Sequence, residues 1–183
     1  MIIALTGTPG TGKTSVSKIL HKKGFEIVDL NKVVCEKNFL FGKDEKRESN
    51  IVDIDRINNY VKENCTGKDI VFIEGHLSHL LKSVDKVFVF RCHPKKLRGN
   101  LSKKGWNEQK IKENVEAEIL DIILCETLEI HQKDNIFEID VSEKSLDDVA
   151  SSIIEIINNK YKHFKKYNIG SIDWSEEILE DFK

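Results

Sequence analysis

The feature that most constrains this chain is the run Gly7-Thr8-Pro9-Gly10-Thr11-Gly12-Lys13-Thr14, which has the spacing G-x-x-x-x-G-K-[ST]. In this pattern glycines let successive backbone N–H groups turn inward around a phosphate, the lysine adds a mobile positive charge and the threonine hydroxyl can bind magnesium. The apolar stretch Ile2 to Leu5 precedes the run, and Ser15 to Lys23 follows it with helical periodicity. Strand, loop and helix come in the order that a phosphate-binding loop requires, so the sequence predicts a nucleotide site.

The loop and the first turn of the following helix are the expected phosphate contacts. The positive end of that helix dipole should face the anion. We therefore predict a nucleotide-binding set that consists of Gly10, Thr11, Gly12, Lys13, Thr14 and Ser15.

Length and charge limit what surrounds this site. At 183 residues the chain is long enough for one well-buried core and too short for two ordinary domains. The formal net charge of -2 gives no overall basic field of the kind that attracts nucleic acid. Any direct contact with RNA must then be local.

The cysteines and the absence of long apolar runs indicate the compartment. The four cysteines are isolated, without a C-x-x-C pair or a metal-ligand spacing, which favours reduced thiols. The chain starts directly with the first expected strand, has no signal-like segment and has no apolar run near the length that spans a bilayer. We expect a cytoplasmic protein that does not contact a membrane.

Strand-like and helix-like segments alternate along the chain. The expected strands are Ile2–Leu5, Glu26–Val28, Ile70–Ile73, Lys86–Phe90 and Asn135–Ile139. Helices are expected at Ser15–Lys23, Leu30–Lys37, Ile54–Cys65, Lys95–Lys103, Glu108–Gln132 and Leu146–His163. This alternation predicts a three-layer α/β fold with a five-stranded parallel sheet, whose ligands bind beyond the carboxyl ends of the strands.

Three further segments lie outside this alternation. The charged stretch Asn38 to Asn50 and the stretch Ser102 to Asn107 are expected to be mobile connections. Phe164 to Lys183 mixes acidic residues with scattered apolar ones, and we favour a short helix docked on the core over a surface offered to a partner.

The phosphate-binding loop alone does not separate kinases, ATPases and GTPases. The N-K-x-D element of guanine-specific proteins is missing, because neither Asn31-Lys32 nor Asn159-Lys160 is followed by the aspartate. Glu74 and His76 follow the third expected strand, where Glu74 can hold magnesium through water and His76 can orient an attacking group or contact phosphate. For His79 we favour a local pairing with the backbone.

Together these segments resemble the adenylate kinase isoenzyme 6 family, whose eukaryotic members are also called coilin-interacting nuclear ATPases. The residues that carry the resemblance are Gly7–Thr14, Ile51–Arg56, Glu74–His76, Lys104–Glu108 and Asn114–Ile119. The resemblance covers roughly residues 1 to 160 and points to the archaeal type of the family.

The resemblance implies a P-loop NTPase fold like that of adenylate kinases, in a domain of residues 1–163 followed by an extension of residues 164–183. Within that domain it implies a monophosphate-binding segment at about Leu30 to Asp53 and a short lid at about Lys103 to Glu113. It also implies ATP-dependent phosphorylation of AMP with magnesium, an ATPase activity, and a role in maturation of the small ribosomal subunit, in a complex with a small-subunit ribosomal protein on the pre-ribosomal 30S particle.

The implied roles fall on a small set of residues. Lys13 bridges the β- and γ-phosphates, Thr14 binds magnesium with Glu74 in its outer shell, and Lys104 closes over the transferring group. Lys144 is the residue implied to lie against the adenine. The implied catalytic set is Lys13, Glu74, His76 and Lys104, and the implied metal ligands are Thr14 and Glu74.

The chain departs from the family pattern at several positions where the family has an arginine. The family often has Arg-Gly-Tyr in the lid, whereas this chain has Lys104-Gly105-Trp106, and Asn100 stands where another arginine is frequent. Lysine keeps the charge but lacks the planar fork that binds phosphate with two hydrogen bonds, so we expect modest kinase turnover unless Arg91 or Arg98 compensates. Glu74 replaces the usual aspartate, and only Lys32 and Lys37 lie where an arginine should hold the monophosphate.

Two alternatives to an AMP kinase stay open at this stage. One is an ATPase switch that acts as a ribosome assembly factor, with AMP phosphorylation as a side activity. The other is a kinase for a different small metabolite, which would need a differently built acceptor pocket.

Overall fold

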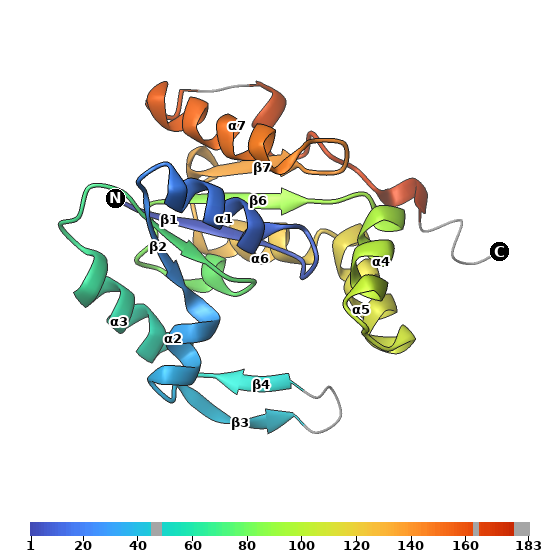
Figure 1. Ribbon diagram of the computed structural model, residues 1–183, viewed down its shortest axis with the longest axis horizontal. Coiled ribbons are helices and arrows are strands. Elements are labelled where there is room, and N and C mark those ends of the chain that lie inside the picture. The colour runs from blue at the N-terminus through green and yellow to red at the C-terminus, as the bar shows by residue number, and fades with distance from the viewer. Residues whose placement is uncertain (45–48, 163–164, 178–183) are drawn as a thin grey trace.

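A computed structural model describes residues 1–44, 49–162 and 165–177 of the chain (Figure 1). Within these ranges one parallel sheet has the strand order β2-β5-β1-β6-β7. The strands are β1 (Ile2–Gly7), β2 (Glu26–Asp29), β5 (Val71–Glu74), β6 (Lys86–Arg91) and β7 (Ile136–Asp140). All five strand predictions and the parallel α/β architecture are thereby confirmed.

Helices connect the strands and cover both faces of the sheet (Figure 1). They are α1 (Lys13–Lys22), α2 (Leu30–Glu36), α3 (Ile54–Cys65), α4 (Pro94–Lys103), α5 (Glu108–Ile119), α6 (Ile122–Ile130) and α7 (Leu146–Asn158). Short 3₁₀ turns are η1 (Ser78–Leu80), η2 (Lys133–Asn135), η3 (Lys165–Tyr167) and η4 (Ser175–Glu177).

Side chains of each central strand alternate between two apolar cores, because successive residues of a strand point to opposite faces. On β1, Ile3 and Leu5 enter the core shared with α1, α4, α5 and α7, while Ile2 and Ala4 enter the core shared with α2, α3 and α6. Both faces are buried, which explains why these strands are almost continuously apolar.

The sheet order places the ends of three strands around the loop that follows β1. β5 pairs with β1 on one side and β6 pairs with it on the other, both in parallel. The loop after β1, Glu74 at the end of β5 and Arg91 at the end of β6 therefore meet at the same edge of the sheet.

The expected connection from Asn38 to Asn50 is instead a β-hairpin. β3 (Leu40–Asp44) pairs antiparallel with β4 (Ser49–Val52), and residues 45–48 lie outside the described residues. The backbone N–H of Asp53 donates to the carbonyl of Phe39 at 2.9 Å, which closes the base of the hairpin. The described part of this segment is therefore a pair of strands and not an irregular connection, because pairing between the two strands satisfies their backbone groups.

Two helix predictions are corrected, one because the helix is interrupted and one because it ends earlier. The helix expected from Glu108 to Gln132 is two helices, because Asp121 takes a left-handed conformation with φ 55° and starts α6 in a new direction. The last helix ends at Asn158, before the left-handed residues Lys160 and Tyr161, and the predicted end at His163 lies outside the described residues.

The described part of the C-terminal extension packs on the core. Tyr167 is buried in the core next to β7, and the N–H of Gly170 donates to Glu138 Oε2 at 2.6 Å. The Trp174 ring lies edge-on to the His93 ring at 5.0 Å. Two 3₁₀ turns stand in place of the expected short helix, and the predicted contacts of Phe164 and of residues 178–183 lie outside the described residues.

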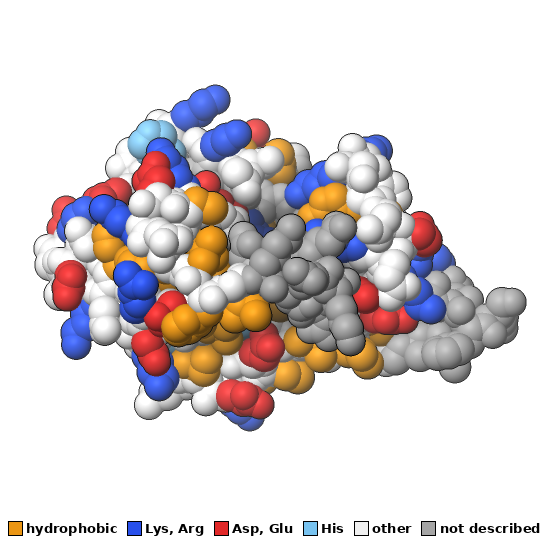
Figure 2. Space-filling view, turned by 90° about the horizontal axis from the view of Figure 1, so that it is seen from below, with side chains coloured by type: hydrophobic (Ala, Val, Ile, Leu, Met, Phe, Trp, Pro, Cys, Tyr) orange, Lys and Arg blue, Asp and Glu red, His pale blue; other side chains and the backbone are white. Residues whose placement is uncertain are grey.

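Cys35, Cys65, Cys92 and Cys125 are all free thiols. Burial and the Glu118 carboxylate raise the pKa of the Cys92 thiol to about 12. No helix in the described part of the chain is long and apolar enough to cross a membrane. Figure 2 shows basic and acidic side chains interspersed over the face seen from below, in keeping with the small net charge.

Candidate active site

Glycines of the loop between β1 and α1 are required by close contacts as well as by backbone angles. Gly7 has φ 136°, and a Cβ atom there would lie 2.5 Å from the Phe90 carbonyl oxygen. Gly10 has φ 96°, and a Cβ atom there would lie 2.9 Å from the Leu101 side chain. Only glycine allows the loop to curl this tightly against β6 and α4, which leaves the N-terminus of α1 open toward the cavity.

Lys13 folds back into this loop. Its Nζ donates hydrogen bonds to the carbonyl oxygens of Gly7 at 2.7 Å and Thr8 at 3.0 Å, and the side chain is 7% exposed. Burial lowers the pKa of Lys13 to about 8, although the nearby Glu74 carboxylate acts in the opposite direction. The carbonyl oxygens of the loop thus accept the hydrogen bonds that the Lys13 ammonium can otherwise donate to a phosphate.

Thr14 and Glu74 meet across the loop. The Thr14 hydroxyl donates to Glu74 Oε1 at 3.0 Å. Burial raises the pKa of Glu74, while the Thr14 hydrogen bond and the Lys13 charge lower it. A hydroxyl and a carboxylate oxygen are donors that suit Mg²⁺, which keeps most of its waters and the substrate phosphates as ligands. The described residues hold no cluster of three His, Cys, Asp or Glu side chains that could hold a metal ion.

His76 follows Glu74 at the same edge of the sheet and lines the cavity. Desolvation by the surrounding protein and the positive charges of Lys13 and His79 lower the pKa of the His76 ring below its ordinary value. A neutral imidazole next to the phosphate site can donate or accept one hydrogen bond at each ring nitrogen.

These residues open into one cavity of about 830 Å³, a size typical of small-molecule sites. The loop residues that line it are Thr8, Pro9, Gly10, Gly12, Lys13, Thr14 and Ser15. The rest of the wall is formed by Asn31, Glu74, His76, Leu77, His79, Asn100, Lys103, Lys104, Trp106, Lys110, Glu113, Asn114, Ala117, Ile123 and Glu126.

Outside the phosphate-binding loop, lysines supply the positive charge of the cavity wall. Lys103, Lys104 and Lys110 come from the expected lid, residues 103–113, and the Lys110 ammonium lies 4.6 Å from the centre of the Trp106 ring. No arginine lines the cavity among residues 1–44, 49–162 and 165–177. Asn100 takes part differently, because its side chain donates to the carbonyl of Gly10 at 3.0 Å and steadies the loop.

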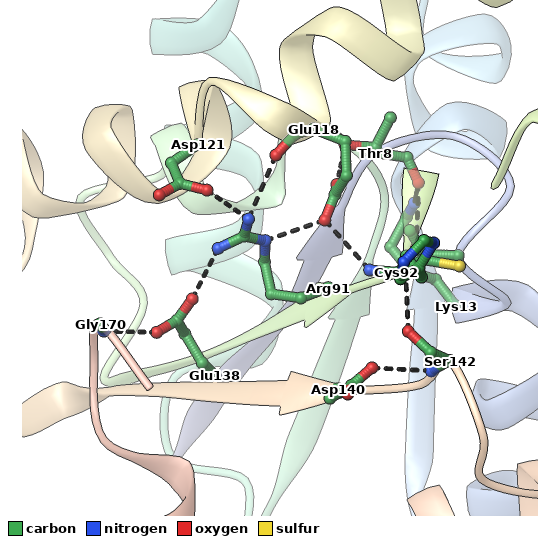
Figure 3. A network of polar contacts seen from close by, with 12 residues as sticks. Thr8, Lys13, Arg91, Cys92, Glu118, Asp121, Glu138, Asp140, Ser142 and Gly170 are labelled. Carbon is green, nitrogen blue, oxygen red and sulfur yellow. Dashed lines mark hydrogen bonds and ion pairs between the residues drawn. The ribbon is translucent and has the colours of Figure 1, made fainter. Parts of the chain in front are cut away.

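Arg91 and Arg98, the two candidates to replace the missing lid arginines, are engaged elsewhere. Arg98 pairs with Glu108 at the start of α5. Arg91 is 2% exposed and lies among three carboxylates, with Nε 2.8 Å from Glu118 and Nη1 2.7 Å from Glu138, while Nη2 pairs with Asp121 (Figure 3). Neither side chain lines the cavity.

The Arg91 cluster ties the phosphate-binding loop to the end of α5. Glu118 accepts hydrogen bonds from Arg91, from the Cys92 N–H at 3.0 Å and from the Thr8 hydroxyl (Figure 3). One buried carboxylate therefore joins the phosphate-binding loop, the end of β6 and the end of α5. Sequence reasoning missed this cluster because its members are far apart in the chain.

Two predicted nucleotide contacts lie away from the cavity wall. Thr11 is buried, and its hydroxyl donates to the Thr8 carbonyl at 2.9 Å, so it shapes the loop. The Lys144 ammonium lies 5.3 Å from the centre of the Tyr167 ring in the C-terminal extension. A contact of Lys144 with the adenine stays a prediction.

His79 makes a local backbone hydrogen bond with His76, as we favoured, and also contacts two distant side chains. Its Nδ1 lies 2.9 Å from the Thr6 hydroxyl and its Nε2 lies 3.0 Å from Glu126 Oε2. Thr6 and Glu126 are 73 and 47 positions away, so no local pattern could have indicated these contacts.

A phosphate-binding loop after the central strand of a five-stranded parallel sheet, facing a lysine-bearing segment across one cavity, defines the class of P-loop kinases. Shikimate kinase from Bacteroides thetaiotaomicron has the same fold, with a TM-score of 0.55 at 15% identity over 86% of this chain and 98% of that one. The structure of TT1252 from Thermus thermophilus is similar as well, with a TM-score of 0.55 at 13% identity over 89% of this chain and 98% of that one.

Sequence comparison narrows the class. Residues 3–121 match the AAA domain family. A protein of Thermococcus gammatolerans named "Putative adenylate kinase" is 41% identical over 96% of this chain and 94% of its own length. A protein of the same name in Archaeoglobus fulgidus is 39% identical over 100% of this chain and 98% of its own length. The relative in Methanocaldococcus jannaschii is 35% identical over 98% and 96%. The chain belongs to this archaeal adenylate kinase family, as the resemblance of its motifs predicts.

Proposed function

We propose that the chain transfers the γ-phosphoryl group of ATP to AMP, giving two ADP, and that it accepts other nucleoside monophosphates. The observation that carries this proposal is a single cavity whose wall includes both the phosphate-binding loop and a second set of polar and apolar side chains on η1, α5 and α6. A donor triphosphate and an acceptor nucleotide would share that space.

In this proposal Lys13 exchanges the carbonyl oxygens of Gly7 and Thr8 for the β- and γ-phosphates of ATP. Thr14 and Glu74 would hold Mg²⁺, which when bound neutralises charge on the β- and γ-phosphates. A phosphate oxygen of AMP forms a bond to the γ-phosphorus as the bond to the β–γ bridging oxygen breaks. Lys104 faces the negative charge that moves during transfer, so catalysis is positioning and charge stabilisation.

ATP hydrolysis is the expected side activity, and one observation favours it. Because only lysines of the described residues supply cations to the cavity wall, the lid lacks the planar forks that fix phosphates by two hydrogen bonds. A less tightly held lid admits water to the γ-phosphate when AMP is absent.

The second candidate function follows from the family resemblance. We propose that ATP binding and hydrolysis also switch an association with a small-subunit ribosomal protein during maturation of the 30S particle. The described part of the C-terminal extension packs on the core and offers a surface that such a partner can contact.

An acceptor screen separates these functions. ADP formation from magnesium-ATP is measured with AMP, CMP, UMP and GMP, and separately without any acceptor, with Lys13→Ala as the inactive control. Conversion of AMP at a rate well above hydrolysis supports the kinase. An ATP hydrolysis rate that does not change with AMP but rises with the purified ribosomal protein supports the switch. Near-full phosphoryl transfer by Lys13→Ala would exclude the loop as the ATP site of either function.

A further inference from the structure

Part of the cavity wall lies outside both the phosphate-binding loop and the lid lysines. It is formed by His79 on η1 and by Ile123 and Glu126 on α6, with Leu77 beside them in the chain. Apolar side chains and a carboxylate make a poor phosphate site, because the carboxylate repels the anion. The same combination suits a flat, uncharged group that carries N–H or O–H donors at its edge.

The contacts of His79 fix which atoms of this wall can accept a hydrogen bond. His79 is 1% exposed, and burial lowers the pKa of its ring. Since an ionised carboxylate only accepts hydrogen bonds, the His79 nitrogen at 3.0 Å from Glu126, Nε2, must carry the proton. The other ring nitrogen, Nδ1, lies 2.9 Å from the Thr6 hydroxyl, which also lies 3.3 Å from the His76 carbonyl oxygen that accepts from it.

This chain of hydrogen bonds leaves one oxygen of Glu126 available. His79 binds Oε2, and among the residues that the structure describes no other hydrogen-bond partner of the Glu126 carboxylate is found. The side chain is 47% exposed and lines the cavity. The His131 ring nitrogen Nε2 donates to the carbonyl of His79 at 2.7 Å, which holds η1 against α6. Glu126 is thus an oriented acceptor on a rigid support.

We infer that Glu126 accepts a hydrogen bond from the nucleoside part of the acceptor monophosphate, either from an exocyclic amine of the base or from a ribose hydroxyl, and that His79 positions it. This inference rests on the proposed function, since it takes the acceptor to be a nucleoside monophosphate. Leu77 and Ile123 supply the apolar surface beside that contact. Glu126 is then a specificity-determining residue and His79 a positioning residue.

Calorimetric binding of AMP to the full chain tests this without relying on turnover. In Glu126→Gln the His79 N–H keeps the amide oxygen, so the amide NH₂ faces the donor of the nucleoside. Loss of one charge-assisted hydrogen bond should weaken AMP binding about ten- to hundredfold, with ATP binding unchanged. Glu129→Gln, on the same helix but outside the cavity wall, is the matched control that should bind AMP normally.

Ligand analogues identify the donor. If the amine is bound, inosine monophosphate binds the wild type weakly and Glu126→Gln no longer distinguishes it from AMP. If a hydroxyl is bound, 2′-deoxy-AMP or 3′-deoxy-AMP behaves in this way. Analogues that all bind like AMP, together with unchanged AMP affinity in Glu126→Gln, overturn the inference while the proposed function stands. A wild type that does not bind AMP overturns both.

The role of His79 has its own readout. His79→Gln should raise the KM for AMP with little change in kcat, and the double variant with Glu126→Gln should lose no more AMP affinity than Glu126→Gln alone. A purely structural His79 would instead lower ATP and AMP affinity together and give additive losses in the double variant, which overturns the positioning role.

Discussion

The Thr14 hydroxyl donates a hydrogen bond to Glu74 Oε1 at 3.0 Å, although the two residues are 60 positions apart. This contact joins the start of α1 to the end of β5 at the point where Mg²⁺ is expected. Glu74→Gln keeps the size and the hydrogen bond but removes the charge. We expect roughly a hundredfold loss of kcat, by comparison with other single groups that stabilise transition-state charge.

The measurement is ADP formation over a range of Mg²⁺ concentrations, with the thermal midpoint as a check on folding. Glu74→Asp is the control, since it restores the charge and shortens the reach by one methylene. Substantial recovery is expected there if a water bridges the carboxylate to the metal. Equal activity of Glu74→Gln and the wild type would contradict the metal assignment.

ATP affinity should fall as the pH rises above about 8, the pKa to which burial lowers Lys13. Below that pH the lysine is charged in both the free and the bound protein, so affinity is flat. Above it the free protein loses the proton that the phosphates need, and affinity falls by up to about tenfold per pH unit. Calorimetry at pH 7 and pH 9 in buffers of different ionisation enthalpy measures both the affinity and the proton uptake. Lys13→Arg, which stays charged, should show no such slope, and an equal slope in both proteins would refute the explanation.

Much of this fold could be predicted because its strands and helices carry local patterns. The five strands were identifiable as apolar runs, and the phosphate-binding loop has a spacing that few other structures share. The hairpin β3–β4 escaped prediction because its strands pair only with each other and only its base, at Leu40 and Val52, packs on the core, so no alternating pattern marks the charged stretch around Gly42.

The site was less predictable where contacts join distant segments. Lys13, Thr14, Glu74, His76 and Lys104 do line one cavity, as the motifs suggested. Asp121, which has a left-handed conformation, pairs with the buried Arg91 across 30 positions, and a contact of that separation leaves no local signal. For the same reason Glu126 gave no sign of lining the cavity.

Arg91→Leu should destabilise the fold by about 3 to 5 kcal/mol, because it leaves buried carboxylates unpaired. Glu138 is fully buried, and burial raises its pKa while Arg91 lowers it. Without Arg91 the pKa of Glu138 should rise further, because burial is no longer opposed by the guanidinium charge. The loss of unfolding free energy should therefore be greatest near pH 7 and should shrink as the pH falls through the raised pKa of Glu138. Urea unfolding at pH 7 and pH 5 measures this. Arg98→Leu, in a more exposed pair, should cost under about 1 kcal/mol, and an equal loss in both variants would contradict the special role of the cluster.

Tyr167→Ala should destabilise the protein by about 3 kcal/mol without affecting ATP affinity. Tyr167 is 1% exposed in the core, and its removal leaves a cavity beneath the C-terminal extension. Urea unfolding and ATP titration measure the two effects separately. Asn168→Ala, at an exposed neighbouring position, should leave both unchanged. An unaltered unfolding midpoint in Tyr167→Ala would mean that the extension does not stabilise the domain.

Lys104→Arg should raise kcat for transfer to AMP and lower the fraction of ATP lost to hydrolysis. Lys104 lines the cavity in the lid, and none of the described arginines does so. A guanidinium in its place presents two parallel donors to a phosphate and stays charged, so it should hold the transferring group in a narrower range of positions.

Simultaneous measurement of ADP and inorganic phosphate gives the ratio of transfer to hydrolysis. Lys112→Arg, on α5 outside the cavity wall, controls for added arginine and should leave the ratio unchanged. A lower kcat in Lys104→Arg together with an unaltered kcat in Lys104→Ala would mean that Lys104 does not face the transferring phosphoryl group. The lid lysines would then not explain the slow transfer that we expect of this chain.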